Sequence, residues 1–351
     1  MTGVFFDARY IRPGFHDGIS RFSANLFSAL ARKIEVTAII SDMAQLDQLP
    51  TGTKWVMLHS PTSWLEPFAA LRLNKYKPSV VFSPMQTIGS LGRRFKLVLT
   101  IHDLIYYRHP APPANLPLLV RLGWRLFHLS FIPERILLWG CNAVVAVSET
   151  TAREIRKNRL TKKPISVVHN APERSIVKLE REKASKSLVY MGSFMPYKNV
   201  ETLIRGVARL SGYHLELLSR IAPIRKSELQ ALADEVGAKI KFHDGVTDAE
   251  YHQLLSKATA LVSASLDEGF GIPLVEAMEL GVPVVVSDIE IFREIAESVG
   301  VYFDPKNPDA FATAVKQVAK SPTEPKSLVS QAAKFNWDES AESLLAAITA
   351  L

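Results

Sequence analysis

The sequence predicts an α/β protein with two doubly wound domains, each a parallel sheet covered by helices. Short apolar runs rich in β-branched residues alternate with amphipathic segments from one end of the chain to the other. The runs are uninterrupted, which is typical of strands buried on both faces of a parallel sheet. A chain of 351 residues also suits two domains of about 100–200 residues each better than one core.

The expected strands fall into two sets along the chain. The first set comprises Gly3–Phe6, Val36–Ile40, Ser79–Ser83, Lys96–Ile101, Ala143–Ser148 and Ile165–His169. The second comprises Ser187–Gly192, Leu215–Ser219, Lys239–His243, Thr259–Ala264 and Pro283–Asp288. Helical patterns lie between them, for example Ile19–Lys33, Val200–Ser211 and Asp248–Ser256. This alternation indicates two Rossmann-like domains.

The boundary between the domains is expected in Asn170–Ser187, a charged segment that is poor in large apolar residues. It separates an N-terminal domain, residues 1–172, from a C-terminal domain that begins at residue 173. No solenoid repeat and no low-complexity tract is evident.

Composition limits the class of protein. An apolar content of 47% and a charged content of 22% are ordinary for a globular chain. The single cysteine, Cys141, cannot form an intrachain disulfide, and Asp7 and Arg9 interrupt the only apolar run that could begin a signal peptide. We therefore expect a cytoplasmic protein.

The net charge of +7 indicates an anionic partner: a phosphate-bearing substrate, an anionic membrane surface or nucleic acid. Nucleic acid is the least favoured, since no basic motif with interleaved aromatic residues occurs. The most apolar region, Leu116–Gly140, contains Arg121, Arg125, Pro133 and Glu134 and is too interrupted to span a membrane. It fits either a buried core helix or a helix that faces a membrane surface.

The segment SASLDEGFGIPLVEAMELGVPVVVSD, Ser263–Asp288, carries the chemistry. A strand is followed by a turn and by a helix that Pro273 opens and Gly281 ends. The amino end of a helix suits a phosphate, and Gly269 and Gly271 let the backbone approach it.

Glu268 lies in this turn, and Glu276 lies about one turn into the helix. Either glutamate alone could be a solvated surface residue. Together, two carboxylates that bracket a phosphate site suit a ligand with a diphosphate and many hydroxyls, which is a nucleotide sugar.

The chain resembles the retaining, nucleotide-sugar-dependent glycosyltransferases of family 4, which have the GT-B fold and an E-x7-E signature. The resemblance covers nearly the whole chain and depends on the order of short motifs: Thr100–Pro110, Val145–Ile155, Val167–Glu173, Tyr190–Ile204, Phe242–Ser265, Ser263–Asp288, Asp288–Ile295, Tyr302–Val315 and Phe335–Ile348. It implies two Rossmann-like domains facing across a cleft: an acceptor domain (1–172) and a donor domain (173–335). It also implies that the helix at 336–351 crosses back to the first domain.

The resemblance assigns roles to individual residues. Glu276 would bind the ribose hydroxyls, Glu268 would contact the donor sugar, and Lys198 would neutralise the diphosphate. His102, with Asp103 behind it, would face the donor sugar from the acceptor domain. The remaining residues implied in donor binding are Gly14, Gly18, Ser193, Asn199, Gly269, Phe270, Gly271 and Leu274.

The chain departs from the family where many members carry an arginine, because Ser193 and Tyr197 occupy those positions. Arg220 is a candidate to compensate. Arg21 follows the glycine loop, and no role is assigned to it.

The implied reaction is transfer of a hexose, with mannose as the guess, from GDP-mannose or a UDP-hexose to an acceptor hydroxyl with retained configuration. The acceptor is expected to be a lipid-linked or cell-envelope glycan, at an anionic membrane surface if Leu116–Gly140 lies outside the core. No D-x-D aspartate pair occurs, so no cofactor and no metal are expected. Two alternatives stay open: a non-catalytic GT-B protein that binds sugar nucleotides, and a GT-B epimerase.

Overall fold

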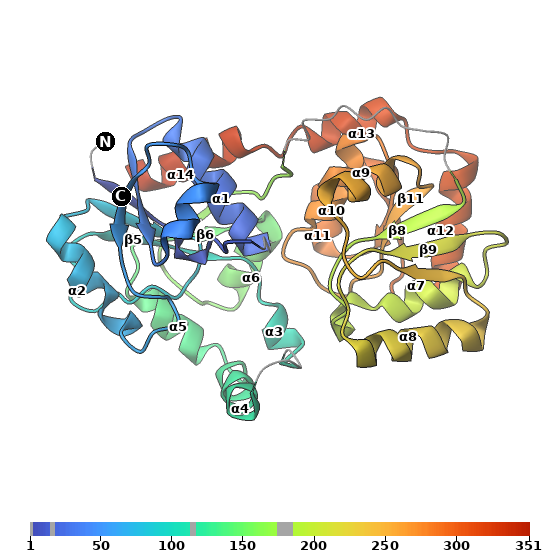
Figure 1. The fold of residues 1–351 in the computed structure, drawn as a ribbon, viewed down its shortest axis with the longest axis horizontal. Coiled ribbons are helices and arrows are strands. Elements are labelled where there is room, and N and C mark those ends of the chain that lie inside the picture. Colours follow the sequence, from blue (N-terminus) through green and yellow to red (C-terminus); the bar gives the residue numbers. More distant parts are fainter. Residues whose placement is uncertain (1–2, 15–17, 113–116, 174–184) are drawn as a thin grey trace. The chain divides into compact units, whose positions relative to one another are not determined.

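The computed structural model describes residues 3–14, 18–112, 117–173 and 185–351. The chain forms two compact units: unit 1 is Met1–Ala171 with Asn336–Leu351, and unit 2 is Pro172–Phe335. Each unit contains one parallel sheet with helices packed on it, so the predicted doubly wound α/β fold is confirmed (Figure 1). Of the expected boundary segment, residues 174–184 lie outside the described residues.

Unit 1 contains a seven-stranded parallel sheet in the order β3-β2-β1-β4-β5-β6-β7. Its strands are β1 (Val4–Asp7), β2 (Val36–Ile40), β3 (Lys54–Met57), β4 (Val80–Ser83), β5 (Lys96–Ile101), β6 (Ala143–Ala146) and β7 (Ile165–Val167). Its helices are α1 (Gly18–Ala31), α2 (Ala69–Leu73), α3 (Ile105–Arg108), α4 (Leu118–Phe127), α5 (Ile132–Trp139), α6 (Glu149–Lys157) and α14 (Trp337–Thr349). Short 3-10 helices are η1 (Ala8–Tyr10), η2 (Met43–Gln48), η3 (Glu66–Phe68) and η4 (Asn74–Tyr76).

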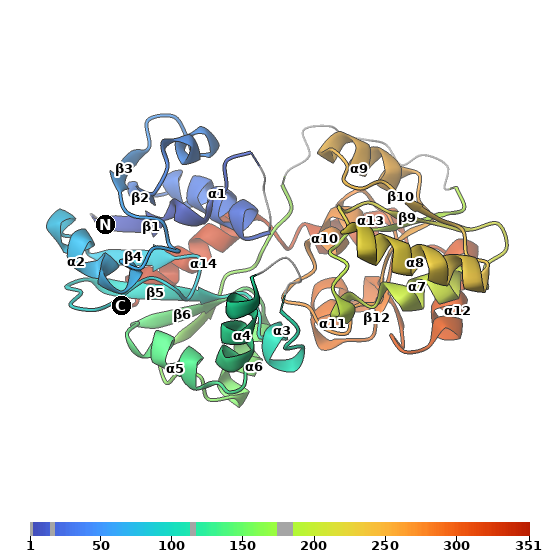
Figure 2. The same cartoon turned by 60° about the horizontal axis from the view of Figure 1, so that its bottom comes forward.

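Unit 2 contains a six-stranded parallel sheet in the order β10-β9-β8-β11-β12-β13. Its strands are β8 (Ser187–Tyr190), β9 (His214–Leu217), β10 (Ile240–Phe242), β11 (Ala260–Ser263), β12 (Val284–Ser287) and β13 (Val301–Phe303). Its helices are α7 (Val200–Val207), α8 (Pro223–Val236), α9 (Asp248–Ser256), α10 (Ile272–Glu279), α11 (Glu290–Ala296), α12 (Pro308–Lys320) and α13 (Pro325–Ala332), with 3-10 helices η5 (Pro196–Lys198) and η6 (Glu297–Val299). Helices α7 and α8 lie side by side in both views (Figures 1 and 2).

The central strands are buried because each sheet is covered on both faces. Successive side chains of a strand point to opposite faces, and β1 shows both. Phe6 packs edge-to-face on Phe27 of α1, with ring centroids 5.4 Å apart. Phe5 belongs instead to the cluster that includes Leu73 of α2 and Leu138 of α5.

Two strands were missing from the sequence prediction. Strand β3 is an edge strand whose Lys54, Trp55 and Met57 are exposed, so it lacks the apolar run of a buried strand. Strand β13 is only three residues long.

The carboxyl-terminal helix α14 packs in unit 1, as the sequence predicts (Figure 1). Trp337 contacts Phe22 of α1 edge-to-face at 5.9 Å between ring centroids. The Ser340 hydroxyl donates to the His169 carbonyl at 2.7 Å, and Arg32 forms an ion pair with Asp338 at 2.6 Å. These contacts tie the last helix to the first and to the end of β7.

The apolar region at Leu116–Gly140 forms two helices, α4 and α5; Leu116 lies outside the described residues. Helix α4 buries none of its residues. The interpretation of this region as a buried core helix is therefore wrong for α4.

Candidate active site

The most developed site in unit 2 lies at the point where the strand order of its sheet reverses. The sheet runs outward from β8 through β9 in one direction and from β11 through β12 in the other. The loops that follow β8 and β11 therefore diverge and leave room for a ligand at the carboxyl ends of the strands. Lys198 lies in the segment after β8, and Glu268 lies in the loop after β11.

Lys198 and Glu268 form an ion pair. The Lys198 Nζ lies 2.5 Å from Glu268 Oε1, and their side chains are 14% and 15% exposed. Ser265 donates to the same carboxylate oxygen at 2.9 Å, which leaves Glu268 Oε2 available to a ligand hydroxyl. Ser265 is a site residue that the sequence analysis missed; its signal is a hydroxyl at the end of a strand, three positions before the glutamate.

Tyr197 occupies one of the positions where the resemblance implies an arginine. The Lys198 Nζ lies 5.3 Å from the centroid of the Tyr197 ring. The aromatic face attracts the ammonium group. Tyr197 thus contributes to holding Lys198 in this position, although it adds no cation.

Hydrogen bonds join the Lys198 turn to the Glu268 loop. The amide of Leu266 donates to the Tyr197 carbonyl at 2.7 Å. The Asn199 side-chain amide donates to the carbonyls of Ala264 (3.1 Å) and Pro305 (2.7 Å). Since both of its N–H donors are used in this way, Asn199 positions the turn, which differs from the predicted direct role in donor binding.

Position 192, at the start of the loop after β8, requires glycine. A Cβ there would lie 2.9 Å from the Tyr190 hydroxyl oxygen, which donates to the Ser193 carbonyl. The Gly192 amide donates to Ser219 at 3.0 Å, so the loop is held between β8 and β9. The Ser193 side chain is exposed, and its backbone carbonyl is the part that supports the loop.

An arginine does reach this loop, from helix α8. The Arg225 Nε donates to the Phe194 carbonyl at 3.2 Å, and its guanidinium pairs with Glu201 and Glu228. Burial lowers the pKa of Arg225, but the two glutamates raise it by more, so the net shift is upward. Arg225 therefore supports the loop, whereas the predicted substitute Arg220 is exposed beside Gly245.

Helix α10 begins beside Glu268. Gly271 caps it with a left-handed φ of +100°, and a Cβ at this position would lie 3.0 Å from the Phe292 ring. Pro273 lies at the start of the helix, as the sequence predicts. The amino end of α10 thus directs its positive dipole end toward the loop of Glu268 and Gly269.

Two residues of this segment that are predicted to bind the donor have buried side chains. Phe270 is 4% exposed and packs edge-to-face on Phe335, with centroids 5.5 Å apart. Leu274 is 2% exposed. Only their backbone can contact a donor, whereas Glu276, on α10, is half-buried.

His102 directly follows β5 in unit 1. Its Nε2 donates to the Pro84 carbonyl at 2.8 Å, its ring contacts Phe22 edge-to-face, and its own carbonyl accepts from Thr151. Asp103 accepts from the amide of Ile105, the first residue of α3, at 3.0 Å. These contacts hold the imidazole at the carboxyl end of the sheet, where ligands of such folds bind.

Gly14 and Gly18 flank residues 15–17, which lie outside the described residues. Gly14 has a left-handed φ of +77°, and Gly18 is the first residue of α1. Since these residues and His102 belong to unit 1 and the other site residues to unit 2, the predicted cleft between the domains stays a prediction.

A buried charge network at the carboxyl end of β1 was not identified from the sequence. The Arg9 guanidinium binds Asp7 at 2.7 Å and 2.9 Å and Glu66 at 2.8 Å through two nitrogens. His59 Nε2 lies 3.0 Å from the same Glu66 carboxylate, and burial lowers the pKa of His59. The signal was two opposite charges directly after an apolar run, but the partner Glu66 is 57 residues away.

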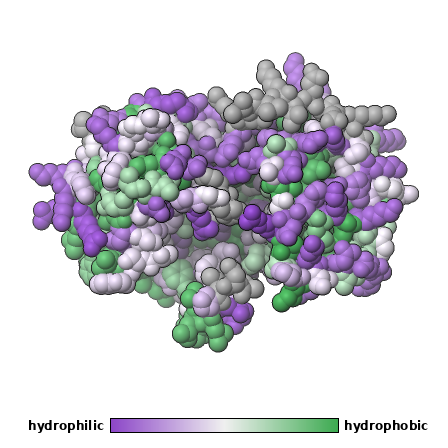
Figure 3. All heavy atoms as spheres, in the orientation of Figure 1, coloured by the Kyte–Doolittle hydropathy of each residue, from purple (hydrophilic) through white to green (hydrophobic). Residues whose placement is uncertain are grey.

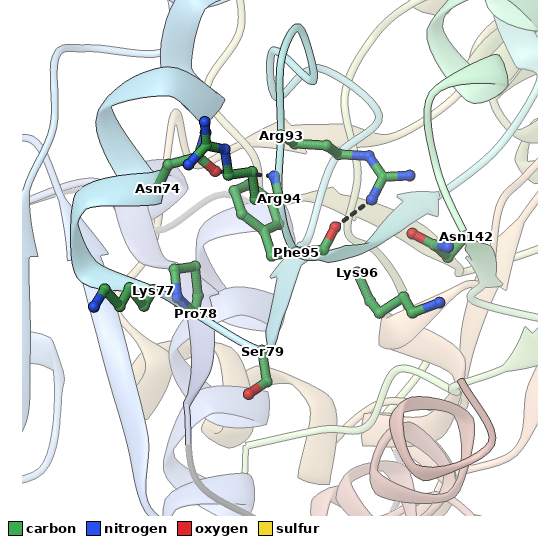
Figure 4. Close-up of a pocket in the computed structure, with 9 residues that line it drawn as sticks. All are labelled: Asn74, Lys77, Pro78, Ser79, Arg93, Arg94, Phe95, Lys96 and Asn142. Atoms are coloured by element: carbon green, nitrogen blue, oxygen red, sulfur yellow. Dashed lines mark hydrogen bonds between the residues drawn. The ribbon is translucent and has the colours of Figure 1, made fainter.

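A pocket of about 630 Å³ lies at the opposite, amino ends of β4, β5 and β6 in unit 1 (Figure 4). It is lined by Asn74, Lys77, Pro78, Ser79, Arg93, Arg94, Phe95, Lys96 and Asn142. Its position at the amino ends of the strands separates it from the predicted site residues of this unit.

Two doubly wound units, with a lysine and a glutamate paired at the switch point of the second, define a glycosyltransferase of the GT-B fold. Residues 16–173 match Glycosyltransferase Family 4, and residues 173–335 match Glycosyl transferases group 1. The chain belongs to this family of glycosyltransferases.

Individual relatives agree with this assignment. The chain is 28% identical to the O-antigen chain mannosyltransferase RfbU of Salmonella typhimurium over 92% of both sequences. It is also 28% identical to the GDP-mannose:cellobiosyl-diphosphopolyprenol alpha-mannosyltransferase of Komagataeibacter xylinus, over 35% of this chain and 33% of that protein. The crystal structure of Anabaena HepE in complex with UDP and glucose has a TM-score of 0.75, with 16% identity over 99% of both chains, and shows the same fold.

Proposed function

We propose that this hexosyltransferase moves mannose from a nucleoside-diphosphate donor to a hydroxyl of a lipid-linked or cell-envelope glycan, with retention of the anomeric configuration. The observation that carries the proposal is the Lys198–Glu268 pair between the loops after β8 and β11. A cation and a carboxylate held together there match the diphosphate and the hydroxyls of a sugar nucleotide.

Lys198 acts on the leaving group. When the bond between the anomeric carbon and the diphosphate breaks, the leaving phosphate gains negative charge, which a positioned ammonium stabilises. The amino end of α10 adds its dipole to the same charge. In the free protein Glu268 shares Lys198, so donor binding must divide the ammonium between the carboxylate and the diphosphate.

Glu268 holds the sugar and Glu276 the nucleoside. The Glu268 Oε2 accepts a sugar hydroxyl while Oε1 stays bound to Ser265 and Lys198. The acceptor oxygen forms the new bond to the anomeric carbon, and its proton passes to the leaving phosphate. His102, in unit 1, faces the donor sugar.

GDP-mannose is the proposed donor, because two relatives are named as mannosyltransferases. One of them matches most of the chain, and the other, whose name includes GDP-mannose, matches about a third of it. A UDP-hexose is the alternative. The acceptor is proposed from the same relatives, one of which is named for an O-antigen chain and one for a diphosphopolyprenol.

We further propose that the reaction needs no metal, with Lys198 and the α10 dipole supplying positive charge at the diphosphate. Activity retained in the presence of a chelator supports this, and activity restored only by a divalent cation contradicts it.

The proposed location is the cytoplasm, at the inner face of the cell membrane. Among the helices that the structure describes, none is long and apolar enough to cross a membrane.

A donor screen tests the proposal. Release of GDP or UDP is measured from a panel of nucleotide sugars, with Glu276→Ala as the control. We expect slow hydrolysis of GDP-mannose by the wild type and its loss in the variant. Binding without release, with or without acceptor, would support the non-catalytic alternative, and release that leaves an epimerised free sugar would support the epimerase.

A further inference from the structure

Helix α4 exposes its leucines and packs Trp124 on the neighbouring helix α3. Leu118 and Leu119 are 78% and 82% exposed, and Leu122 and Leu126 are exposed as well. Trp124 packs edge-to-face on Tyr106 of α3, with ring centroids 4.8 Å apart. A helix of a globular domain normally buries its apolar stripe, so the leucines of α4 form a surface that no part of the described chain covers.

Helix α5 and the turn before it also expose apolar side chains. Four exposed side chains follow α4 at helical spacing: Leu129, Ile132, Ile136 and Trp139. Trp139, at the end of α5, is 84% exposed. Figure 3 shows hydrophobic residues gathered over α4 at the tip of this unit. Apolar patches of this kind mark protein or membrane contacts.

The charge of this segment distinguishes a membrane from a protein as the partner. Between Leu118 and Trp139 the sequence holds Arg121, Arg125 and Arg135 and a single acidic residue, Glu134, which is buried. The exposed charges of this segment are therefore all positive. Apolar side chains flanked only by cations match the acyl chains and the phosphates of an anionic bilayer.

The basic pocket of unit 1 adjoins the end of α5. The Arg93 Nε donates to the carbonyl of Gly140, the residue after Trp139, at 2.8 Å. Lys77, Arg94 and Lys96 line the same pocket and are exposed (Figure 4). Cations at the level of an exposed tryptophan are the arrangement found at membrane interfaces.

We propose that the protein docks on anionic phospholipid bilayers through α4 and α5, with the leucines and Trp139 in the interfacial layer and the arginines at lipid phosphates. This deepens the proposed function, since it brings the enzyme to a lipid-linked acceptor. Tyr106 belongs to α3, whose first residue, Ile105, donates its amide to Asp103, the residue after His102. The docked helix thus lies one helix away from the proposed catalytic histidine.

Vesicle sedimentation tests the docking surface directly. The probes are vesicles of phosphatidylcholine alone and of phosphatidylcholine mixed with phosphatidylglycerol. The test variant is Leu119→Glu/Leu122→Glu, and the matched control is Ile224→Glu, which places a glutamate at an exposed aliphatic residue of α8 in unit 2. Both substitutions lie on the surface, and circular dichroism checks that each variant folds.

We expect the wild type and the control to sediment with the anionic vesicles and not with the neutral ones. The double variant should bind at least roughly tenfold more weakly, because it loses two apolar contacts and gains two negative charges. Trp139 emission should shift to shorter wavelength on anionic vesicles, and Trp139→Phe should remove that shift.

Three results would overturn the proposal: a wild type that stays in solution with anionic vesicles, a double variant that still sediments, or a wild-type dimer that the double variant converts to a monomer. In the last case a second copy of the chain covers the surface. Hydrolysis of the donor in solution is measured on the same samples. A double variant that hydrolyses the donor normally but does not bind vesicles separates docking from the transferase reaction.

Discussion

Replacing the buried Glu134 with glutamine changes how stability depends on pH. Glu134 is 2% exposed, its Oε1 finds no hydrogen-bond partner among the described residues, and Tyr107 donates to Oε2 at 3.3 Å. Burial raises the pKa of Glu134 from its ordinary value of 4.5 to about 7, although the Tyr107 hydrogen bond opposes this. Above pH 7 the folded protein must hold a buried, poorly paired carboxylate.

The magnitude follows from linkage. The folded state binds the Glu134 proton more tightly than the unfolded chain, so stability falls as pH rises from 4.5 through about 7. A tenfold change in proton affinity corresponds to about 1.4 kcal/mol, so the full penalty at alkaline pH is about 3 kcal/mol. Glutamine cannot ionise, so Glu134→Gln escapes this penalty.

The assay is urea unfolding of wild type and variant in parallel at about pH 5 and about pH 8. Between the two pH values we expect the free energy of unfolding of Glu134→Gln to rise relative to that of the wild type by about 2.5 kcal/mol, because part of the penalty is already present at pH 5. Glu235→Gln, on the exposed side of α8, controls for the change of side chain alone. Tyr107→Phe should move the fall in stability to higher pH, since it removes the hydrogen bond that lowers the pKa of Glu134.

A difference between wild type and Glu134→Gln that stays constant with pH would refute the reasoning. It would mean that the Glu134 carboxylate is solvated or paired in the folded protein. A difference that grows in the opposite direction would mean that the ionised form stabilises the contact between α5 and α3.

Four further predictions concern the site itself. Lys198→Met should lower donor turnover by about 10²–10³, since it removes the cation at the leaving diphosphate. Glu268→Ala should lower turnover more than donor affinity. Unchanged kinetics in either variant would remove that residue from the site. Gly271→Ala should destabilise the protein by about 1–3 kcal/mol, as measured by thermal unfolding, because φ is +100° and the new Cβ would meet Phe292 at 3.0 Å; an unchanged melting temperature would contradict this. His102→Ala should lower turnover, and wild-type activity would exclude a catalytic role.

Local chemistry made part of the site predictable. The ring of Pro273 fixes a φ that suits the start of a helix, and Gly281 tolerates the left-handed backbone that ends one, so the turn and helix of Ser263–Asp288 could be predicted from the sequence. In the structure the segment begins at the last residue of β11 and forms α10 and β12, and Gly281 follows α10 closely. The helices at Ile19–Lys33 and Asp248–Ser256 were likewise predicted to within a few residues.

Contacts between distant segments could not be predicted. Sequence reasoning placed Asn199 at the donor, but its side chain bonds Ala264 and Pro305, which only the packing of three loops brings near. The network of Asp7, Arg9 and Glu66 joins residues far apart in the chain. No local pattern encodes such a partner.

The sequence by itself determined the doubly wound architecture and the family, since buried parallel strands and helix ends leave local patterns. Only the tertiary structure decided which face of each apolar segment packs against the rest of the protein. Burial depends on what packs against a helix, and α4 has the composition of a core helix. Its Trp124 contacts α3, and its leucines are exposed.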